Sequence, residues 1–318
     1  MGWLLGQTLA GRQHLELFRT VDGGRHWVAL PAPPAPPRWQ GQKEPADGVA
    51  RVTFADSRNG WLYGPGLWAT HDGGMTWHRV ATHGAQVGSV QASGGRVLAA
   101  FSKCGGRCQP VQPRFAVYRS PAGGDDWQRV VGASGQGSGG VVVTGRTGYA
   151  LGASGPSLAA SALVTGPAAG PGRWQRRSLP CGSFLPALIA ASAAGLILTC
   201  EWPAGAHPVG VLVFRSANGG LTWHRLSRLS LEDGVGSLSI TPAGVIIVAG
   251  MYNGMLISGD GGRTWHRVAS VDNTDAVGGG GVIGVTMFGN RVGAAVVQAD
   301  RAWLTRDGGR VWFPVTIP

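Results

Sequence analysis

A short box of eight residues recurs from one end of the chain to the other, and this repetition limits the fold more than any other feature. The clearest copy reads Thr-His-Asp-Gly-Gly-Met-Thr-Trp over residues 70–77. Copies occupy residues 20–27, 70–77, 120–127, 165–174, 216–223, 258–265 and 305–312. Their tryptophans are Trp27, Trp77, Trp127, Trp174, Trp223, Trp265 and Trp312, so the steps are 50, 50, 47, 49, 42 and 47 residues. A period of this length indicates an array of supersecondary units.

Each unit contains the pattern of four short strands. In the second unit the strand-like runs cover residues 49–55, 60–64, 67–71 and 76–81, separated by turn residues. Continuous apolar runs between turn residues fit strands that are buried on both faces. The box lies between the third and fourth strands, where its glycines supply positive φ and its Asp accepts backbone N–H bonds.

The composition agrees with a folded chain that has many turns. Glycine accounts for 55 of 318 residues and 43% of residues are hydrophobic, which excludes a disordered chain. One four-stranded sheet cannot bury both of its faces, but sheets that pack radially cover each other. The sequence therefore predicts an all-β fold, a seven-bladed β-propeller of four-stranded antiparallel blades, as a single domain over residues 1–318.

The first unit begins where the other units have their second strand. Residues 2–6 (Gly-Trp-Leu-Leu-Gly) match residues 60–64 (Gly-Trp-Leu-Tyr-Gly), and the chain ends on the fourth strand of the seventh unit. We therefore expect the first blade to lack its innermost strand. We also expect the natural start to lie upstream, with that strand.

The long loops are predicted to share one end of the blades. Loops between second and third strands emerge at the same end as blade-joining loops, and the boxes emerge at the other. The long loops cover residues 31–48, 103–113, 201–208 and 270–276. We call their end the loop face and expect recognition there, because loops on a rigid scaffold commonly carry function. The candidate binding residues are Trp39, Lys103, Arg107, Glu201, Trp202 and Asp272.

Four cysteines form two locally spaced pairs, Cys104 with Cys108 and Cys181 with Cys200. The first pair lacks the second half of a zinc site. Two disulfides would suit an exported protein, and two reduced pairs fit the same spacing. The sequence has no apolar stretch of about 20 residues that would form a spanning helix. No signal peptide is recognisable after Met1.

The pattern Ser/Thr-x-Asp-Gly-Gly-x-Thr-Trp resembles the Asp-box, or bacterial neuraminidase repeat. This repeat occurs in sialidases, xyloglucan-active hydrolases, sortilin-type receptors and photosystem II assembly factors. Residues 54–64 are most similar to the last group, and the repeat pattern covers essentially the whole chain. The resemblance implies that the box acids are structural, and each box indole is expected to anchor its blade. The structural set is Asp22, Trp27, Asp72, Trp77, Trp127, Trp174, Asn218, Trp223, Asp260, Trp265, Asp307 and Trp312.

The sequence offers little evidence for catalysis. A sialidase-type site would need an arginine triad, a Tyr/Glu pair, an acid Asp and an early Arg-Ile-Pro segment, and Arg-Ile-Pro is missing. A glycosidase needs two facing carboxylates about 5–10 Å apart. Glu201, which lies beside Trp202, and Asp272 are the candidates, and solvated loop acids are the alternative. His78, His224 and His266 each follow a box Trp in different blades, so we expect them not to share a metal.

The chain is basic, with 27 Lys+Arg against 16 Asp+Glu and a net charge of +11. This balance raises nucleic acid as a partner. However, one arginine follows most box tryptophans by two residues, which spreads the charge around the units: Arg79, Arg129, Arg176, Arg225 and Arg267. A charge on each outermost strand discourages edge-to-edge pairing. We therefore expect no nucleic-acid partner.

These observations favour a monomeric, exported binding or assembly scaffold without catalytic residues, cofactor or metal. Its loop face would contact a protein or a glycan. In a phototrophic host, the resemblance implies photosystem II assembly. The alternative is a carbohydrate-active hydrolase of the sialidase or xyloglucanase type, which convergent carboxylates on the loop face would favour.

Overall fold

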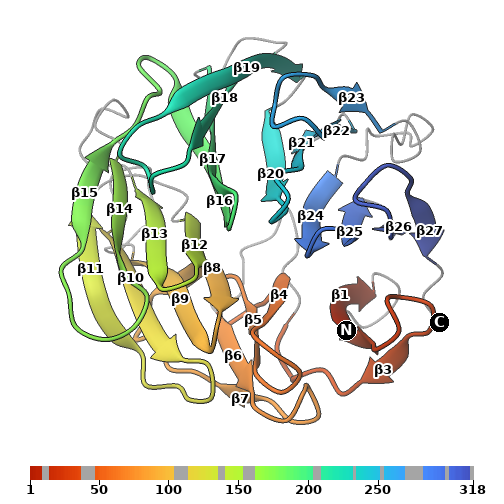
Figure 1. Cartoon of the computed structure of the whole chain (residues 1–318). Helices are drawn as coiled ribbons and strands as arrows, with labels where there is room; N and C mark the ends of the chain where they lie inside the picture. The colour runs from red at the N-terminus through yellow and green to blue at the C-terminus, as the bar shows by residue number, and fades with distance from the viewer. Residues whose placement is uncertain are drawn as a thin grey trace. The chain divides into compact units, whose positions relative to one another are not determined.

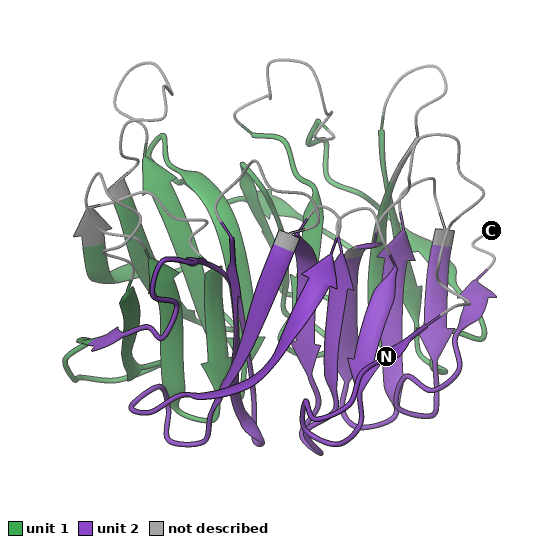
Figure 2. Cartoon of the chain, turned by 90° about the horizontal axis from the view of Figure 1, so that it is seen from above, with its two compact units in different colours: residues 1–176, 318 green, residues 177–317 purple. Residues whose placement is uncertain are grey.

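The computed structural model describes residues 1–8, 14–36, 47–103, 114–134, 140–152, 162–202, 209–231, 234–250, 254–268, 282–297 and 301–315. These residues form strands and turns without a helix, and no membrane-spanning helix occurs among them. The chain divides into two compact units, Met1–Arg176 with Pro318 and Arg177–Ile317 (Figure 2). The expectation of one domain over residues 1–318 stays a prediction.

The first unit contains four antiparallel sheets of consecutive strands (Figure 1). The first sheet has β1 (Gly2–Thr8), β2 (His14–Thr20) and β3 (Val28–Leu30). The second has β4 (Arg51–Phe54), β5 (Gly60–Tyr63), β6 (Leu67–Thr70) and β7 (His78–Arg79). The third has β8 (Gln86–Ser93), β9 (Arg96–Lys103), β10 (Arg114–Pro121) and β11 (Gln128–Ser134). The fourth has β12 (Gly140–Thr144), β13 (Thr147–Gly152), β14 (Ala162–Pro167) and β15 (Gln175–Ser178), which ends in the second unit.

The second unit contains three antiparallel sheets of the same kind. The fifth sheet of the chain has β16 (Leu185–Ser192), β17 (Gly195–Glu201), β18 (Val209–Ser216) and β19 (His224–Leu231). The sixth has β20 (Val235–Ile240), β21 (Ile246–Gly250), β22 (Met255–Ser258) and β23 (His266–Arg267). The seventh has β24 (Val282–Phe288), β25 (Val292–Val297), β26 (Arg301–Thr305) and β27 (Phe313–Val315).

Each sheet is a meander in which sequence neighbours pair, and this is the strand order of a propeller blade. The predicted fold class, an all-β seven-bladed β-propeller, is therefore confirmed. Among the described residues the first blade has three strands, which correspond to the second, third and fourth strands of the other blades. The register supports this match, because Gly2 pairs with Thr20 as Gly60 pairs with Thr70, and each threonine is the first residue of its box.

Neighbouring blades within a unit pack through their apolar faces. In the second unit, Ile197 and Val213 of blade five form one buried cluster with Ile246 of blade six. The first strands of neighbouring blades also contact each other: β4 with β8, β8 with β12, β16 with β20, and β20 with β24. The continuous apolar runs of the sequence are thus explained by strands that are covered on both faces.

Aromatic side chains join the first two blades. The rings of Trp3 in β1 and Phe54 in β4 stack with centroids 3.7 Å apart and planes 4° apart. A Cβ at position 60 would lie 2.4–2.6 Å from the Phe54 ring, so only glycine fits there. Trp77, the tryptophan of the second box, packs against the cluster of blades one and two that contains Leu17 and Leu62. The box indole thus lies at a contact between blades.

Candidate functional site

The box aspartates are held by their own turns. Asp72 Oδ1 accepts hydrogen bonds from the N–H groups of Met75 and Thr76, each at 3.0 Å, and from the Thr70 hydroxyl at 2.8 Å. Bonds from the hydroxyl and the N–H of Thr76 hold the pKa of Asp72 well below its usual range. The same pattern of backbone bonds closes the turns at Asp22, Asp260 and Asp307. These carboxylates thus accept hydrogen bonds within their own turns.

Three boxes depart from this pattern, and the fourth, residues 165–174, contains no acid. In the fifth, Asn218 Oδ1 accepts from the N–H of Thr222 at 2.9 Å, so the amide replaces the acid as acceptor. In the third, Ala122 stands at the acid position, and the Ser120 hydroxyl donates to the Gly124 carbonyl oxygen at 2.8 Å. The third turn therefore closes without a carboxylate.

The structure describes part of the predicted binding set. Trp39, Arg107 and Asp272 lie outside the described residues, as do Cys104 and Cys108. Lys103 is exposed at the end of β9 in blade three. Glu201 and Trp202 follow one another at the end of β17 in blade five. Glu201 and Trp202 are therefore the predicted binding residues that lie next to one another among the described residues.

A disulfide and an aromatic pair shape this end of blade five. Cys181, in the loop before β16, is bonded to Cys200 in β17, and their Cα atoms lie 5.5 Å apart. The N–H of Phe184 donates to the Cys181 carbonyl oxygen at 2.9 Å, and the N–H of Trp202 donates to the Gly210 carbonyl oxygen at 3.1 Å. We call Phe184, Glu201, Trp202 and the disulfide the blade-five patch.

The two aromatic rings of the patch meet edge to face. The centroids of Phe184 and Trp202 are 4.8 Å apart, and their planes are inclined by 81°. Edge-to-face pairs of this kind are favourable beyond the area they bury. The Trp202 side chain is nevertheless 46% exposed, although its position is fixed on one side by the phenyl ring. The patch thus presents a half-exposed indole, packed against a phenyl ring, at the end of β17.

Glu201 is oriented toward the next blade. Its Oε1 accepts a hydrogen bond of 2.5 Å from the N–H of Val235, the first residue of β20. Its carboxylate lies against Gly234, where an added Cβ would be 3.1 Å from Oε1. Burial raises the pKa of the Glu201 carboxyl, and the bond from Val235 opposes this rise. Glu201 therefore connects blades five and six.

A second carboxylate for hydrolysis is missing from the part of the second unit that the structure describes. Within that part the other acids are Asp260 and Asp307, and each is bonded to its own box turn. The predicted partner, Asp272, lies outside the described residues. The facing pair that glycoside hydrolysis requires is thus not assembled by the described residues of the second unit.

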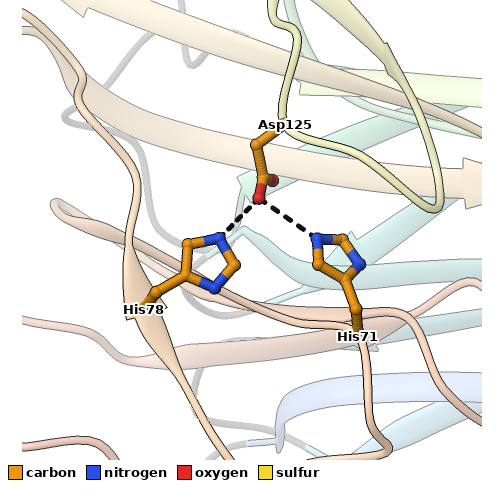
Figure 3. Close-up of side chains that lie close together, drawn as sticks. All are labelled: His71, His78 and Asp125. Carbon is orange, nitrogen blue, oxygen red and sulfur yellow. Dashed lines mark hydrogen bonds and ion pairs between the residues drawn. The ribbon is translucent and has the colours of Figure 1, made fainter.

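A further polar cluster joins blades two and three. His71 follows β6, His78 begins β7, and Asp125 lies in the third box turn (Figure 3). Sequence reasoning considered His78 together with His224 and His266 and missed its true neighbours, His71 and Asp125. The available signal was the third box, which has Ala122 at the usual acid position and an acid three residues later.

Comparisons with known proteins show a fold and no family. No family model matches the chain, and no curated protein matches it. Its structure is similar to YCF48 from Cyanidioschyzon merolae, with 16% identity and a TM-score of 0.53 over 84% of each chain. A puromycin hydrolase gives 15% identity and a TM-score of 0.60, over 98% of this chain and 52% of that one. A GH74 enzyme of Niastella koreensis gives 14% identity and a TM-score of 0.44, over 95% and 62%. Identities this low carry the fold and not the activity.

Proposed function

We propose that the chain is a non-catalytic binding scaffold that holds a protein partner at the blade-five patch of the loop face. The observation that carries the proposal is Trp202, which is 46% exposed while Phe184 supports its ring. Tryptophan is enriched among the residues that dominate binding energy at protein interfaces. The patch offers such an anchor in a fixed position.

The rigidity of the patch favours binding. The Cys181–Cys200 disulfide connects the loop before β16 to β17, and the backbone of Trp202 is bonded to Gly210. Association normally costs free energy because loops and side chains become ordered. Here much of that order exists before the partner arrives, so more of the apolar contact contributes to affinity.

The surroundings of Glu201 favour a scaffold over the hydrolase alternative. A raised pKa suits a general acid, and this is the observation in favour of hydrolysis. However, the Glu201 carboxylate is bonded to the N–H of Val235, and the other acids described in the second unit are bonded to their own turns. We therefore assign Glu201 to the support of the patch.

Two further properties complete the proposal. A Cys181–Cys200 disulfide persists in oxidising compartments, so we place the protein outside the cytoplasm. The similarity of the boxes to those of photosystem II assembly factors favours an assembly role in a phototrophic host. Cell fractionation and recovery of the oxidised chain from the exported fraction would test the location.

The binding proposal is tested with one variant and a matched control. Wild-type protein is cross-linked in its native host, and the partner found by mass spectrometry is purified for titration. Trp202→Ala should weaken binding by about 2 kcal/mol, or roughly 30-fold, as for an interface hot spot. Phe288→Ala is the control, because Phe288 is also 46% exposed but ends β24, at the box end of blade seven. Its affinity should match that of the wild type.

Two results would contradict the proposal. One is a partner that binds Trp202→Ala as tightly as the wild type. The other is release of sugar from a polysaccharide by the wild type that Glu201→Gln abolishes, which would support the hydrolase instead. The two assays use different variants, so each result can be interpreted separately.

A further inference from the structure

Two imidazole side chains of blade two converge on one carboxylate oxygen of the third box turn. Nε2 of His71 lies 3.1 Å from Oδ2 of Asp125, and Nε2 of His78 lies 2.5 Å from the same atom. Both imidazole rings are turned toward that oxygen (Figure 3). The candidate ligand atoms of the three residues all lie within 4.8 Å of one another.

The outer partners of His71 determine which of its nitrogens carries a proton. Asp56 accepts a 2.8 Å bond from Nδ2 of Asn59, and a carboxylate can only accept, so the Asn59 amide oxygen faces His71. Nδ1 of His71 then donates to that oxygen at 2.8 Å. Burial would raise the pKa of Asp56, but bonds from the Asn59 side chain and the N–H of Arg58 lower it below its usual value. Asp56 is therefore ionised and fixes this orientation.

This orientation aims the Nε2 atom of His71 at Oδ2 of Asp125. A cation between the two atoms, either a proton or a metal ion, would be held by both of them. Metal-binding histidines commonly donate their other ring N–H to an oxygen acceptor, which is the arrangement of His71 and Asn59.

Asp125 has acceptor capacity that the described residues do not use. Its Oδ1 is buried and accepts no hydrogen bond from any described residue. A buried carboxylate oxygen without a partner can be satisfied by an ion, a water or a ligand. This atom belongs to the same carboxylate that both histidines contact, so the unpartnered oxygen and the two imidazole nitrogens occur in one place.

The cluster is specific to blades two and three. Positions that match His78 in blades five and six are His224 and His266, but the matches of His71 there are Ala217 and Gly259. The following boxes carry arginine where box three has Asp125: Arg263 in blade six and Arg310 in blade seven. His224 and His266 thus repeat the position of His78, but neither has a neighbour that matches His71 or Asp125.

We propose that His71, His78 and Asp125 form a binding site for a divalent transition-metal ion such as Zn²⁺. Two imidazoles and one carboxylate are typical ligands of zinc, and catalytic zinc sites also have three protein ligands with an open fourth position. The ion would connect blade two to the third box turn, which lacks the usual box acid. The fourth position remains open to water or to a side chain of a partner.

Small movements would produce the required geometry. Zinc–ligand distances of about 2.0–2.1 Å place tetrahedral ligand atoms about 3.4 Å apart. The His71–Asp125 separation of 3.1 Å is close to this value. Nε2 of His78 has to withdraw by about 1 Å, and its side chain, which is 53% exposed, has room to turn.

Zinc titration of the untagged chain tests the site. Cys104→Ser and Cys108→Ser are introduced into every sample, because free thiols bind zinc. One equivalent of Zn²⁺ should bind by calorimetry after chelator treatment, and Mg²⁺ should not compete. His71→Ala, His78→Ala and Asp125→Asn should each lower the affinity at least tenfold. His224→Ala and His266→Ala are the matched controls and should bind as the parent does.

A positioning role for Asn59 gives a second readout. Asn59→Ala should weaken zinc binding about 10- to 100-fold, as expected when an outer partner of a ligand is lost. X-ray absorption of the zinc-loaded chain should show two imidazole ligands. The proposal is overturned if no zinc binds, if the ligand variants bind like the controls, or if ¹⁵N shifts show His71 doubly protonated with zinc present. The last result would identify a histidine–aspartate ion pair between blades.

Discussion

The Cys181–Cys200 disulfide is expected to stabilise blade five by a measurable amount. The two cysteines are 19 residues apart in the sequence. Cross-linking a loop of that length removes entropy from the unfolded chain, and the chain-entropy relation gives about 3 kcal/mol at 25 °C. Reduction should therefore lower the free energy of unfolding of this region by about 3 kcal/mol.

Reduction is a cleaner perturbation than substitution. Cys181 is 6% exposed and Cys200 is fully buried, so truncating them would add the cost of a cavity. The protein is reduced in denaturant and refolded with reductant. Hydrogen exchange of β16, β17 and β18 then measures the free energy of local opening in each form.

The control separates this bond from the other cysteine pair. In a Cys104→Ser, Cys108→Ser background the loss on reduction should remain complete. Opening free energies of the oxidised and reduced forms that agree within about 0.5 kcal/mol would refute the entropy argument. If reduction no longer lowers the opening free energy once Cys104 and Cys108 are replaced by serine, the effect belongs to that cysteine pair. Reduction should also weaken partner binding at the blade-five patch.

Three substitutions test the other structural assignments. Gly262→Ala should destabilise the fold more than Gly23→Ala. Both positions have positive φ, which costs an alanine roughly 1–2 kcal/mol. Only at position 262 would the added Cβ also clash with a side chain, because it would lie 2.6 Å from Leu226. Equal losses in urea unfolding would contradict this. Asp72→Asn should make the stability of the fold less sensitive to acid. The depressed pKa of Asp72 means that its ionised carboxylate stabilises the folded state; this stabilisation is present above about pH 4 and is lost as the pH falls below it. Acid unfolding curves that superimpose would count against the assignment. Glu201→Gln should be at least as stable as the wild type at pH 7. The raised pKa of Glu201 means that protonation of its carboxyl stabilises the folded state; this stabilisation is complete below about pH 4 and is lost as the pH rises through the pKa of the folded state. A clear loss of stability of Glu201→Gln at pH 7 would contradict the raised pKa of Glu201.

The strands could be read from the sequence because burial on both faces leaves a continuous apolar run. Residues 60–64 were predicted as a strand, and β5 covers Gly60–Tyr63. Residues 76–81 were predicted as the fourth strand, whereas β7 is limited to His78–Arg79. Asp72 explains the later start, because it holds the N–H groups of Met75 and Thr76 in the turn.

The sites were harder to predict because they depend on contacts between blades. Glu201 was singled out for its neighbour Trp202, but its bond to Val235 depends on the packing of β17 beside β20. His71 and Asp125 are 54 positions apart, and no local spacing rule joins them. The Phe184–Trp202 pair was also missed, because its geometry follows from the loop before β16.

The meander topology also determines how the chain can acquire its structure. Every sheet pairs strands that are consecutive in the sequence, and the Cys181–Cys200 bond lies within one blade and the loop that leads into it. Contacts between near neighbours in sequence shorten the search for the native pairing, and repeat arrays can nucleate at one unit and grow outward. The strands of one blade can therefore pair before the other blades are folded, and the blade gains its buried faces as its neighbours form. The cross-link needs no residue of the sixth or seventh blade, so it can close in an oxidising compartment before those blades have folded.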